Sequence, residues 1–248
     1  MTFYEYHHQS TPLILGNVWD VPSATSAEQL GFKALGTSSA AMAKMFGYPD
    51  GEKIPFAHIR LFINRILEHV NVPVSVDIEA GYSRRPAVIA QHICELADLG
   101  VVGINLEDSI VADKRQLQDP EVFAEIIVAV KANIPATVFL NVRTDTFLLN
   151  FPDKLAETKR RSQLYAQAGA DGFFVPGLTA AEDITAVIGN TKLPLNVMCF
   201  PGLPTFAKLA HLGVARVSMG NFLYESQQGD LSQRLAKVLA DQSFDSVC

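Results

Sequence analysis

The sequence has little cysteine, no surplus of basic residues and no long apolar run. Its three cysteines, Cys94, Cys199 and Cys248, lack the spacing of a metal or redox motif, which favours a reducing compartment over a disulfide framework. The formal net charge of -6 leaves no excess of Lys and Arg for phosphate backbones, so we expect no nucleic-acid partner. No stretch approaches the roughly 20 apolar residues of a membrane span, and residues 1–8 have no cleavable leader pattern. We therefore expect a cytoplasmic protein without membrane attachment.

The composition is that of a globular protein with a large core, because 48% of the residues are hydrophobic and 19% are charged. A weak internal repeat runs through it, in which a helical pattern ends in a small residue or Leu plus Gly and an apolar strand follows at once. The four copies of this helix stop are Leu30-Gly31, Leu99-Gly100, Ala168-Gly169 and Leu212-Gly213.

Eight short apolar runs are predicted to be strands, at residues 12–16, 32–36, 73–77, 101–105, 136–142, 170–174, 194–198 and 214–218. Helical patterns follow them at 23–30, 55–70, 86–99, 120–132, 153–168, 180–188 and 204–212, and from about 220 to 240. Strict strand and helix alternation with continuously apolar strands indicates a parallel sheet covered on both faces. We predict an α/β fold, a (β/α)₈ TIM barrel in one domain over residues 1–248, with a C-terminal helical tail from about 220. An open doubly wound sheet is disfavoured because no GxGxxG follows the first strand.

Acidic residues gather where the predicted strands end, which is the active-site face of such a barrel. Asp77 and Glu79 follow the third strand, Glu107 follows the fourth, and Asp50 lies in the loop after the second. Any one acid could be a helix cap, but several in one mouth are costly unless a cation or protons neutralise them, and a hard divalent ion fits. Since no histidine falls at a strand end, oxygen ligands favour Mg²⁺ or Mn²⁺ over Zn²⁺, and we predict Asp77, Glu79 and Glu107 as metal residues.

An arginine and several polar residues complete the predicted site. Arg143 ends the fifth strand and suits the binding of a carboxylate or of a developing enolate. Asn196 lies near the exit of the seventh strand and is a candidate for substrate binding. Asp20, Asp108 and Asp145 are weaker candidates, because acids at such positions often cap helices or bind loops.

Four motifs in order resemble the isocitrate lyase/phosphoenolpyruvate mutase superfamily: the runs at residues 75–82, 103–108, 142–145 and 168–171. The resemblance implies a Mg²⁺-dependent barrel that acts on small α-oxo or α-hydroxy carboxylates through an enolpyruvate-like intermediate. By position it implies that Asp77 binds the metal, that Glu79 and Glu107 hold metal-bound waters, and that Asp50 lies nearby. It likewise implies that Arg143, Ser38, Ser39 and Ala40 bind the substrate, and that the protein is a homo-oligomer, a dimer or a tetramer.

The segment after the fourth strand departs from the superfamily pattern. The lyases of the superfamily carry a Lys-(Lys/Arg)-Cys-Gly-His loop there, and residues 109–118 have no such motif. We therefore place the chain in a short-lid subgroup, expect residues 109–118 to be the lid, and name Lys114 as its candidate catalytic residue beside Arg143, Asp50 and Glu107.

Three functional hypotheses follow. The first is a Mg²⁺-dependent carbon–carbon lyase for an oxaloacetate- or isocitrate-like carboxylate, acting through an enolate. The second is a mutase or hydrolase that acts on the P–C bond of phosphonopyruvate or converts phosphoenolpyruvate. The third is a protein that binds oxo acids without turnover, because a fold alone does not guarantee chemistry.

Overall fold

Nine parallel strand segments form one sheet at the centre of the molecule. The computed structural model describes residues 1–248, and its main sheet has the order β1-β11-β10-β9-β8-β5-β4-β3-β2. The bounds of these strands are β1 Leu13–Ile14, β2 Gly16–Val18, β3 Leu35–Thr37, β4 Val74–Asp77, β5 Gly103–Glu107, β8 Phe139–Arg143, β9 Gly172–Val175, β10 Leu195–Met198 and β11 Arg216–Ser218. All eight predicted strands are confirmed, since β1 and β2 are two parts of the first.

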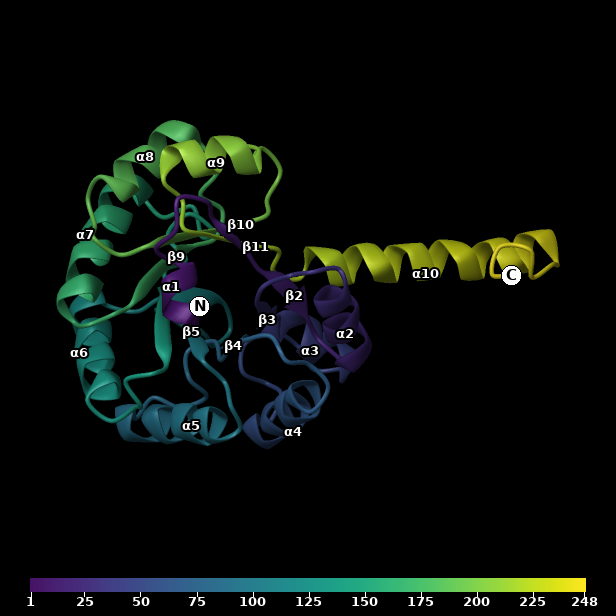
Figure 1. Cartoon of the computed structure of the whole chain (residues 1–248), viewed down its shortest axis with the longest axis horizontal. Coiled ribbons are helices and arrows are strands. Elements are labelled where there is room, and N and C mark those ends of the chain that lie inside the picture. Colours follow the sequence, from purple (N-terminus) through teal and green to yellow (C-terminus); the bar gives the residue numbers. More distant parts are fainter.

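The sheet closes into a barrel through that first strand. Leu13 and Ile14 pair with β11, whereas Gly16, Asn17 and Val18 pair with β3, so one short segment joins the two ends of the strand order. Figure 1 looks at this ring of strands, with the helices arranged around it. The fold is therefore the predicted (β/α)₈ barrel.

The outer layer consists of the helices that the sequence predicts. They are α2 Val21–Gln29, α4 Phe56–Leu67, α5 Pro86–Asp98, α6 Pro120–Lys131, α7 Lys154–Gln167, α8 Ala181–Ile188 and α9 Phe206–Leu212, while the predicted C-terminal helix, α10 Phe222–Asp241, lies outside this layer. A cluster of 41 buried apolar residues fills the space between helices and strands. Two of the helices begin with strong caps, because the side chains of Asp20 and Asp119 accept backbone N–H groups of the first turn.

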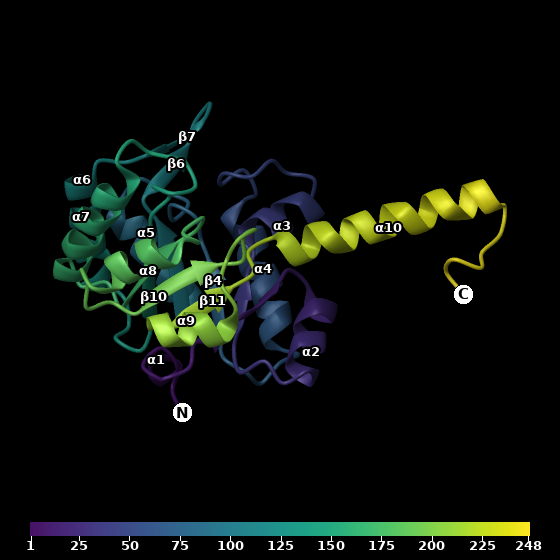
Figure 2. The same ribbon diagram turned by 90° about the horizontal axis from the view of Figure 1, so that it is seen from above.

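Four elements were not predicted. They are two short helices, α1 Phe3–Tyr6 and α3 Ser39–Met45, and an antiparallel hairpin made of β6 Ser109–Val111 and β7 Arg115–Leu117. Helix α1 covers the floor of the barrel, where Phe3 and Phe139 pack together and His7 stacks on Phe139 at 4.0 Å between ring centroids. The hairpin stands at the opposite end, in the position predicted for the lid, as Figure 2 shows.

Above this floor the barrel interior is polar. Asn141 donates to Asn105 at 2.9 Å and to Asn196 at 3.1 Å, which links three strands inside the barrel. Arg216 is buried beside them and donates to Asn105 at 3.4 Å. Burial lowers the pKa of Arg216 to about 9, although the charge of Asp77 opposes this shift.

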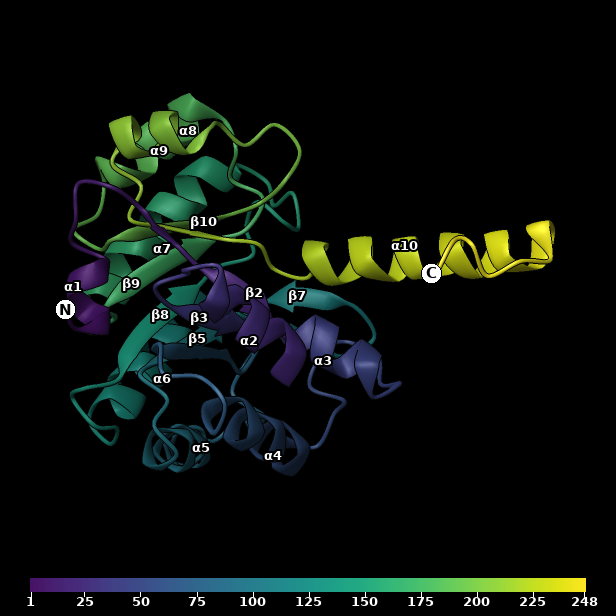
Figure 3. The same ribbon diagram turned by 45° about the vertical axis from the view of Figure 1, so that its right-hand side comes forward.

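Helix α10 leaves the barrel and extends away from it, as Figures 1 and 3 show from two directions. Four of its leucines are exposed, namely Leu223, Leu231, Leu235 and Leu239. None of the helices combines the length and the apolar character that crossing a membrane would require.

Candidate active site

A cavity of about 200 Å³ opens at the carboxyl ends of the strands. It brings together residues from both ends of the strand order, among them Asn17 of β2, Asp77 of β4, Arg143 of β8 and Ser218 of β11. This is the face where (β/α)₈ barrels carry their active sites, because each strand delivers its last side chains to the same mouth.

Asp77 is the best-oriented acid in this mouth. It is half-buried, lines the cavity, and accepts a hydrogen bond from Ser39 Oγ at 2.8 Å. The N–H of Glu79 donates to the other carboxylate oxygen at 3.4 Å, and the N–H of Asp77 donates to Thr37 Oγ1 at 3.1 Å. One side of the carboxylate is thus fixed by the protein while the residue still faces the cavity.

Glu79 lies beside Asp77 but is fully enclosed and does not line the cavity. Its backbone has a positive φ of 51°, and its carboxylate accepts from the Glu52 N–H at 2.8 Å and from the Tyr82 hydroxyl at 3.0 Å. Burial together with the charges of Asp50 and Asp77 raises the pKa of Glu79 to about 7. Such crowding of negative charge is what a bound cation relieves.

Glu107 and Asp145 form a buried acidic pair that Arg143 neutralises. Arg143 contacts Glu107 Oε2 at 3.0 Å and Asp145 Oδ1 at 2.6 Å. Burial raises the pKa of Glu107, with Asp145 adding to the shift and the arginines opposing it. Burial alone would raise the pKa of Asp145 as well, but the charges of Arg143 and Arg115 and the hydrogen bonds from Arg143 and Ser109 together outweigh it, so the pKa lies below its usual value.

Arg115, in the hairpin, is the residue of the lid that reaches this cluster. Its guanidinium contacts Asp50 at 3.0 Å, Asp145 at 3.1 Å and also Glu107. Lys114, which the sequence analysis named, is exposed and does not line the cavity. The sequence alone could not show whether Lys114 or Arg115 points toward the cavity, because successive side chains alternate between the two faces of a hairpin.

Asp108 lies behind the site and supports it. It is fully buried and accepts from Arg161 at 2.6 Å, from the Tyr165 hydroxyl at 2.7 Å and from the Asp145 N–H at 3.3 Å. Its role is therefore to fix the backbone that carries Asp145. The weaker candidate Asp20 is a helix cap, whose carboxylate accepts from the Ser23 N–H at 2.8 Å.

The other predicted residues lie at two levels, either at the cavity or deeper inside the barrel. Ser38, Ser39, Ala40 and Asp50 line the cavity together with Asp77 and Arg143. Helix α3 begins at Ser39, so the first N–H groups of this helix have no acceptor within it. Asn196 lies deeper, where its amide donates to Val197 O at 2.7 Å and accepts from Asn141, and it does not line the cavity.

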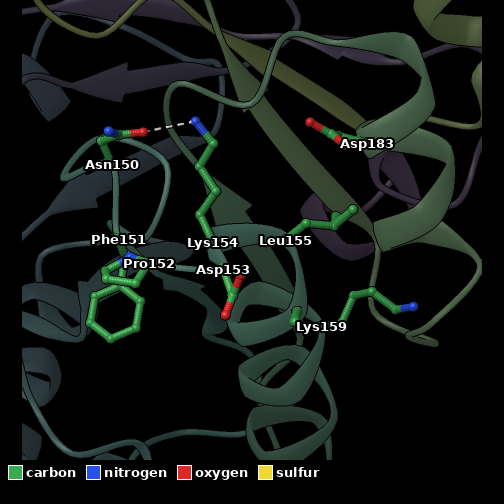
Figure 4. A pocket seen from close by; sticks show the side chains of 9 residues that line it. Asn150, Phe151, Pro152, Asp153, Lys154, Leu155, Lys159 and Asp183 are labelled. Carbon is green, nitrogen blue, oxygen red and sulfur yellow. Dashed lines mark hydrogen bonds between the residues drawn. The ribbon is translucent and has the colours of Figure 1, made fainter.

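A wider depression of about 700 Å³ lies outside the barrel mouth, at the start of α7 (Figure 4). Lys154 stands at its centre and donates to Asn150 Oδ1 at 3.0 Å. Its lining comes from the loop before α7, from α7 itself and from Asp183, and no strand contributes to it. It is therefore separate from the acid and arginine cluster.

The residues of the mouth fit a Mg²⁺ ion held largely through water. No group of three carboxylate, imidazole or thiolate side chains converges on one point. Mg²⁺ nevertheless keeps several waters and needs only one or two carboxylates in direct contact. Asp77 and Asp50 both line the cavity. Burial first, and then the charges of Asp50 and Asp77, raise the pKa of Glu79, and such an ion would offset those charges.

Comparisons with known proteins agree with this geometry. A family model described as phosphoenolpyruvate phosphomutase matches residues 3–239. The chain belongs to this family. The predicted membership of the isocitrate lyase/phosphoenolpyruvate mutase superfamily is thereby confirmed.

Several members of the family are similar over most of the barrel. An uncharacterized protein of Mycobacterium tuberculosis (strain ATCC 25618 / H37Rv) is 40% identical over 226 residues, which are 91% of this chain and 84% of the relative. The 2-methylisocitrate lyase of Aeropyrum pernix is 32% identical over 74% of this chain and 60% of its own length. A crystal structure from Burkholderia cenocepacia J2315, of a protein assigned provisionally as a phosphonomutase, has a TM-score of 0.87 and 37% identity, with 94% of this chain and 97% of that chain covered. The family is one of lyases and mutases, which supports an enzymatic role.

Proposed function

We propose that this chain is a Mg²⁺-dependent enzyme that cleaves a carbon–carbon bond in a small 2-oxo or 2-hydroxy carboxylate. The observation that carries the proposal is the arrangement of Asp77, Ser39 and Arg143 around one small cavity at the strand ends. Relatives by sequence include a 2-methylisocitrate lyase and the oxaloacetate decarboxylase of Bradyrhizobium, which is 30% identical over 73% of this chain. When bound, Mg²⁺ would offset the negative charge on the carboxylate and 2-oxygen of the substrate.

The residues of this chain have separate roles in the proposal. Asp77 and Asp50 would hold the metal through direct contact or through water, with Glu79 and Glu107 behind them. Ser38, Ser39 and the N–H groups at the start of α3 would bind the carboxylate of the substrate. In a 2-oxo acid the bond between C3 and C4 would break, and the C4 fragment would leave without the bonding electron pair, for example as CO₂. That pair would form an enolate, whose negative C2 oxygen the guanidinium of Arg143 would stabilise. The hairpin would exclude water while Arg115 holds it on the cluster.

The proposal is tested by calorimetric titration of oxalate in the presence and absence of Mg²⁺. We expect binding that requires the metal and is lost in Asp77→Ala. Asp98→Ala, an exposed acid at the end of α5, is the matched control and should bind as the unmodified protein does. Oxalate binding that is unchanged by Asp77→Ala would refute the site.

A second candidate is chemistry at a P–C bond, which the match to the phosphoenolpyruvate phosphomutase model favours. It uses the same metal site and differs in the group that leaves. Phosphorus NMR of a reaction with phosphonopyruvate distinguishes the two, because release or migration of phosphorus gives new resonances. Binding of oxo acids without any product across both tests would indicate a member that binds without turnover.

We also propose that the protein is a homo-oligomer held together through α10. A 20-residue helix that extends from the barrel with Leu231, Leu235 and Leu239 exposed on one side has apolar surface that a second copy could cover. Sedimentation of the intact chain against a chain stopped at Gly229 tests this. The same number of chains per particle for both proteins would contradict the proposal.

A further inference from the structure

Arg216 is a buried cation inside the barrel that forms no ion pair. It is 1% exposed, and its nitrogens Nε and Nη1 have no hydrogen-bond partner in the protein. Its guanidinium keeps its charge at neutral pH, because burial lowers the pKa of Arg216 only to about 9 and the charge of Asp77 opposes the shift. Burying a charge without an ion pair is unfavourable for the fold, which points to a role in the site above it.

The side chain of Arg216 lies one layer below the cavity. Arg216 and Ser218 are two residues apart on β11, so their side chains point to the same inner face, and Ser218 lines the cavity. Nη2 of Arg216 donates to Oδ1 of Asn105 at 3.4 Å, and Asn105 also lines the cavity. Asn105 stands opposite Asp77 in the register of β4 and β5. The guanidinium thus reaches the cavity through the amide of Asn105.

The hydrogen bonds of Asn105 determine which way its amide points. Its Oδ1 accepts from Arg216 and from Nδ2 of Asn141, which is 2.9 Å away. A guanidinium can only donate, so the atom of the amide that faces it is the oxygen. No residue accepts from Nδ2 of Asn105, which is the side of the amide left for the cavity. A hydrogen-bond donor is therefore available to a ligand beside Asp77.

We infer that Asn105 binds an acid oxygen of the substrate and that Arg216 is the positioning residue behind it, whose charge favours a negatively charged oxygen over a neutral one. This inference rests on the proposed function, because it takes Asp77 as the end of the cavity where the metal and the acid oxygens lie. In the water-poor interior the guanidinium acts over a longer distance than in water, and its hydrogen bond to Oδ1 strengthens the donor on Nδ2. The C2 oxygen is neutral in a 2-oxo acid and negative in the enolate, so this pair of residues favours the enolate.

The test compares oxalate with oxamate by calorimetry in the presence of Mg²⁺. The two ligands have nearly the same shape, but oxalate is negative at both ends and oxamate has a neutral amide at one of them. We expect Arg216→Met to weaken oxalate binding by about tenfold or more and oxamate binding less, because a hydrogen bond to a charged partner is worth about that much. Arg60→Met, which removes an exposed guanidinium from α4, is the matched control and should leave the ratio of the two affinities unchanged.

The stability of the same variants separates a role in binding from a role in folding. Replacing a buried unpaired charge by an apolar side chain of similar volume should leave the melting temperature of Arg216→Met unchanged or raise it. Arg216→Gln, which keeps an N–H donor without the charge, should also reduce the ratio of the oxalate and oxamate affinities. A lower melting temperature with an unchanged ratio, or failure of both variants to fold, would assign Arg216 to the fold alone and overturn the inference.

The outcomes also distinguish this inference from the proposed function. Asn105→Leu, which removes the donor, should weaken oxalate binding by about tenfold or more. If oxalate binds and depends on Asp77, but the ratio is unchanged in the Arg216 variants or Asn105→Leu binds oxalate as the unmodified protein does, the inference is overturned and the proposed function stands. If oxalate does not bind, the proposed function fails and the inference fails with it.

Discussion

The buried pair of Asp108 and Arg161 supports the active site from behind, and its removal has a calculable effect on stability. Both side chains are almost completely buried, and Asp108 also accepts from Tyr165 and from the backbone of Asp145. Asp108→Asn removes the negative charge and leaves the guanidinium with Glu157, which it contacts at 2.8 Å. Breaking a buried pair at one partner costs about 3–5 kcal/mol, and the remaining contact puts the expected loss near the lower end, at about 3 kcal/mol.

The assay is urea denaturation followed by circular dichroism, with thermal unfolding as a second measure. A loss of about 3 kcal/mol in a chain of this length lowers the melting temperature by about 6–12 °C. The double variant Asp108→Asn/Arg161→Met should be far more stable than the sum of the single losses predicts, because it leaves no unpaired buried charge. Asp241→Asn breaks an exposed pair with Lys237 and should cost less than about 1 kcal/mol. A loss below 1 kcal/mol for Asp108→Asn, or strict additivity in the double variant, would refute the reasoning.

Three further predictions concern the floor, the lid and the barrel interior. Burial lowers the pKa of His7 to about 3, so below about pH 6.5 the unfolded chain binds a proton that the folded chain does not, and the stability of the fold decreases as the pH falls. Between pH 6.5 and 5.5 the free energy of unfolding should therefore drop by about 1 kcal/mol more in the unmodified protein than in His7→Gln. Parallel pH profiles of the two proteins would contradict this. Arg115→Met should raise hydrogen exchange in the β6–β7 hairpin by about tenfold or more, because it removes charged hydrogen bonds, whereas Lys114→Met should not. A methyl group at Gly172 would stand 2.7 Å from the buried Oδ1 of Asn141, so Gly172→Ala should lower the free energy of unfolding, measured by urea denaturation, by about 1–3 kcal/mol. Gly229→Ala, in the exposed helix α10, should leave this free energy unchanged or raise it.

The sequence was sufficient to predict the barrel and its helices, because the alternation of apolar strands and Gly-terminated helices repeats over the whole chain. The short elements escaped prediction since they have too few residues for a period to show: α1 has four residues and each hairpin strand has three. Their positions depend on tertiary contacts, such as the stacking of His7 on Phe139.

Residues on strands were easier to place in the candidate site than residues on loops. Asp77 and Arg143 are the last residues of β4 and β8, so the rule for strand ends puts them at the mouth. Asn196 is two residues before the end of β10, and a step of two residues keeps the inward direction but moves the side chain one layer down. Arg115 could not be found in this way, because its direction depends on the register of the hairpin.

The way in which the barrel closes has a consequence for synthesis on the ribosome. Residues 13–18 pair with β3 on one side and with β11 on the other, and β11 spans Arg216–Ser218. The nascent chain therefore carries an unpaired sheet edge until nearly nine tenths of its residues have been made. At about 5–20 residues per second that interval lasts about 10–40 s, during which an open edge can pair with other chains. We expect the yield of folded protein to depend more on chaperones that bind the nascent chain during translation than on the stability of the finished barrel.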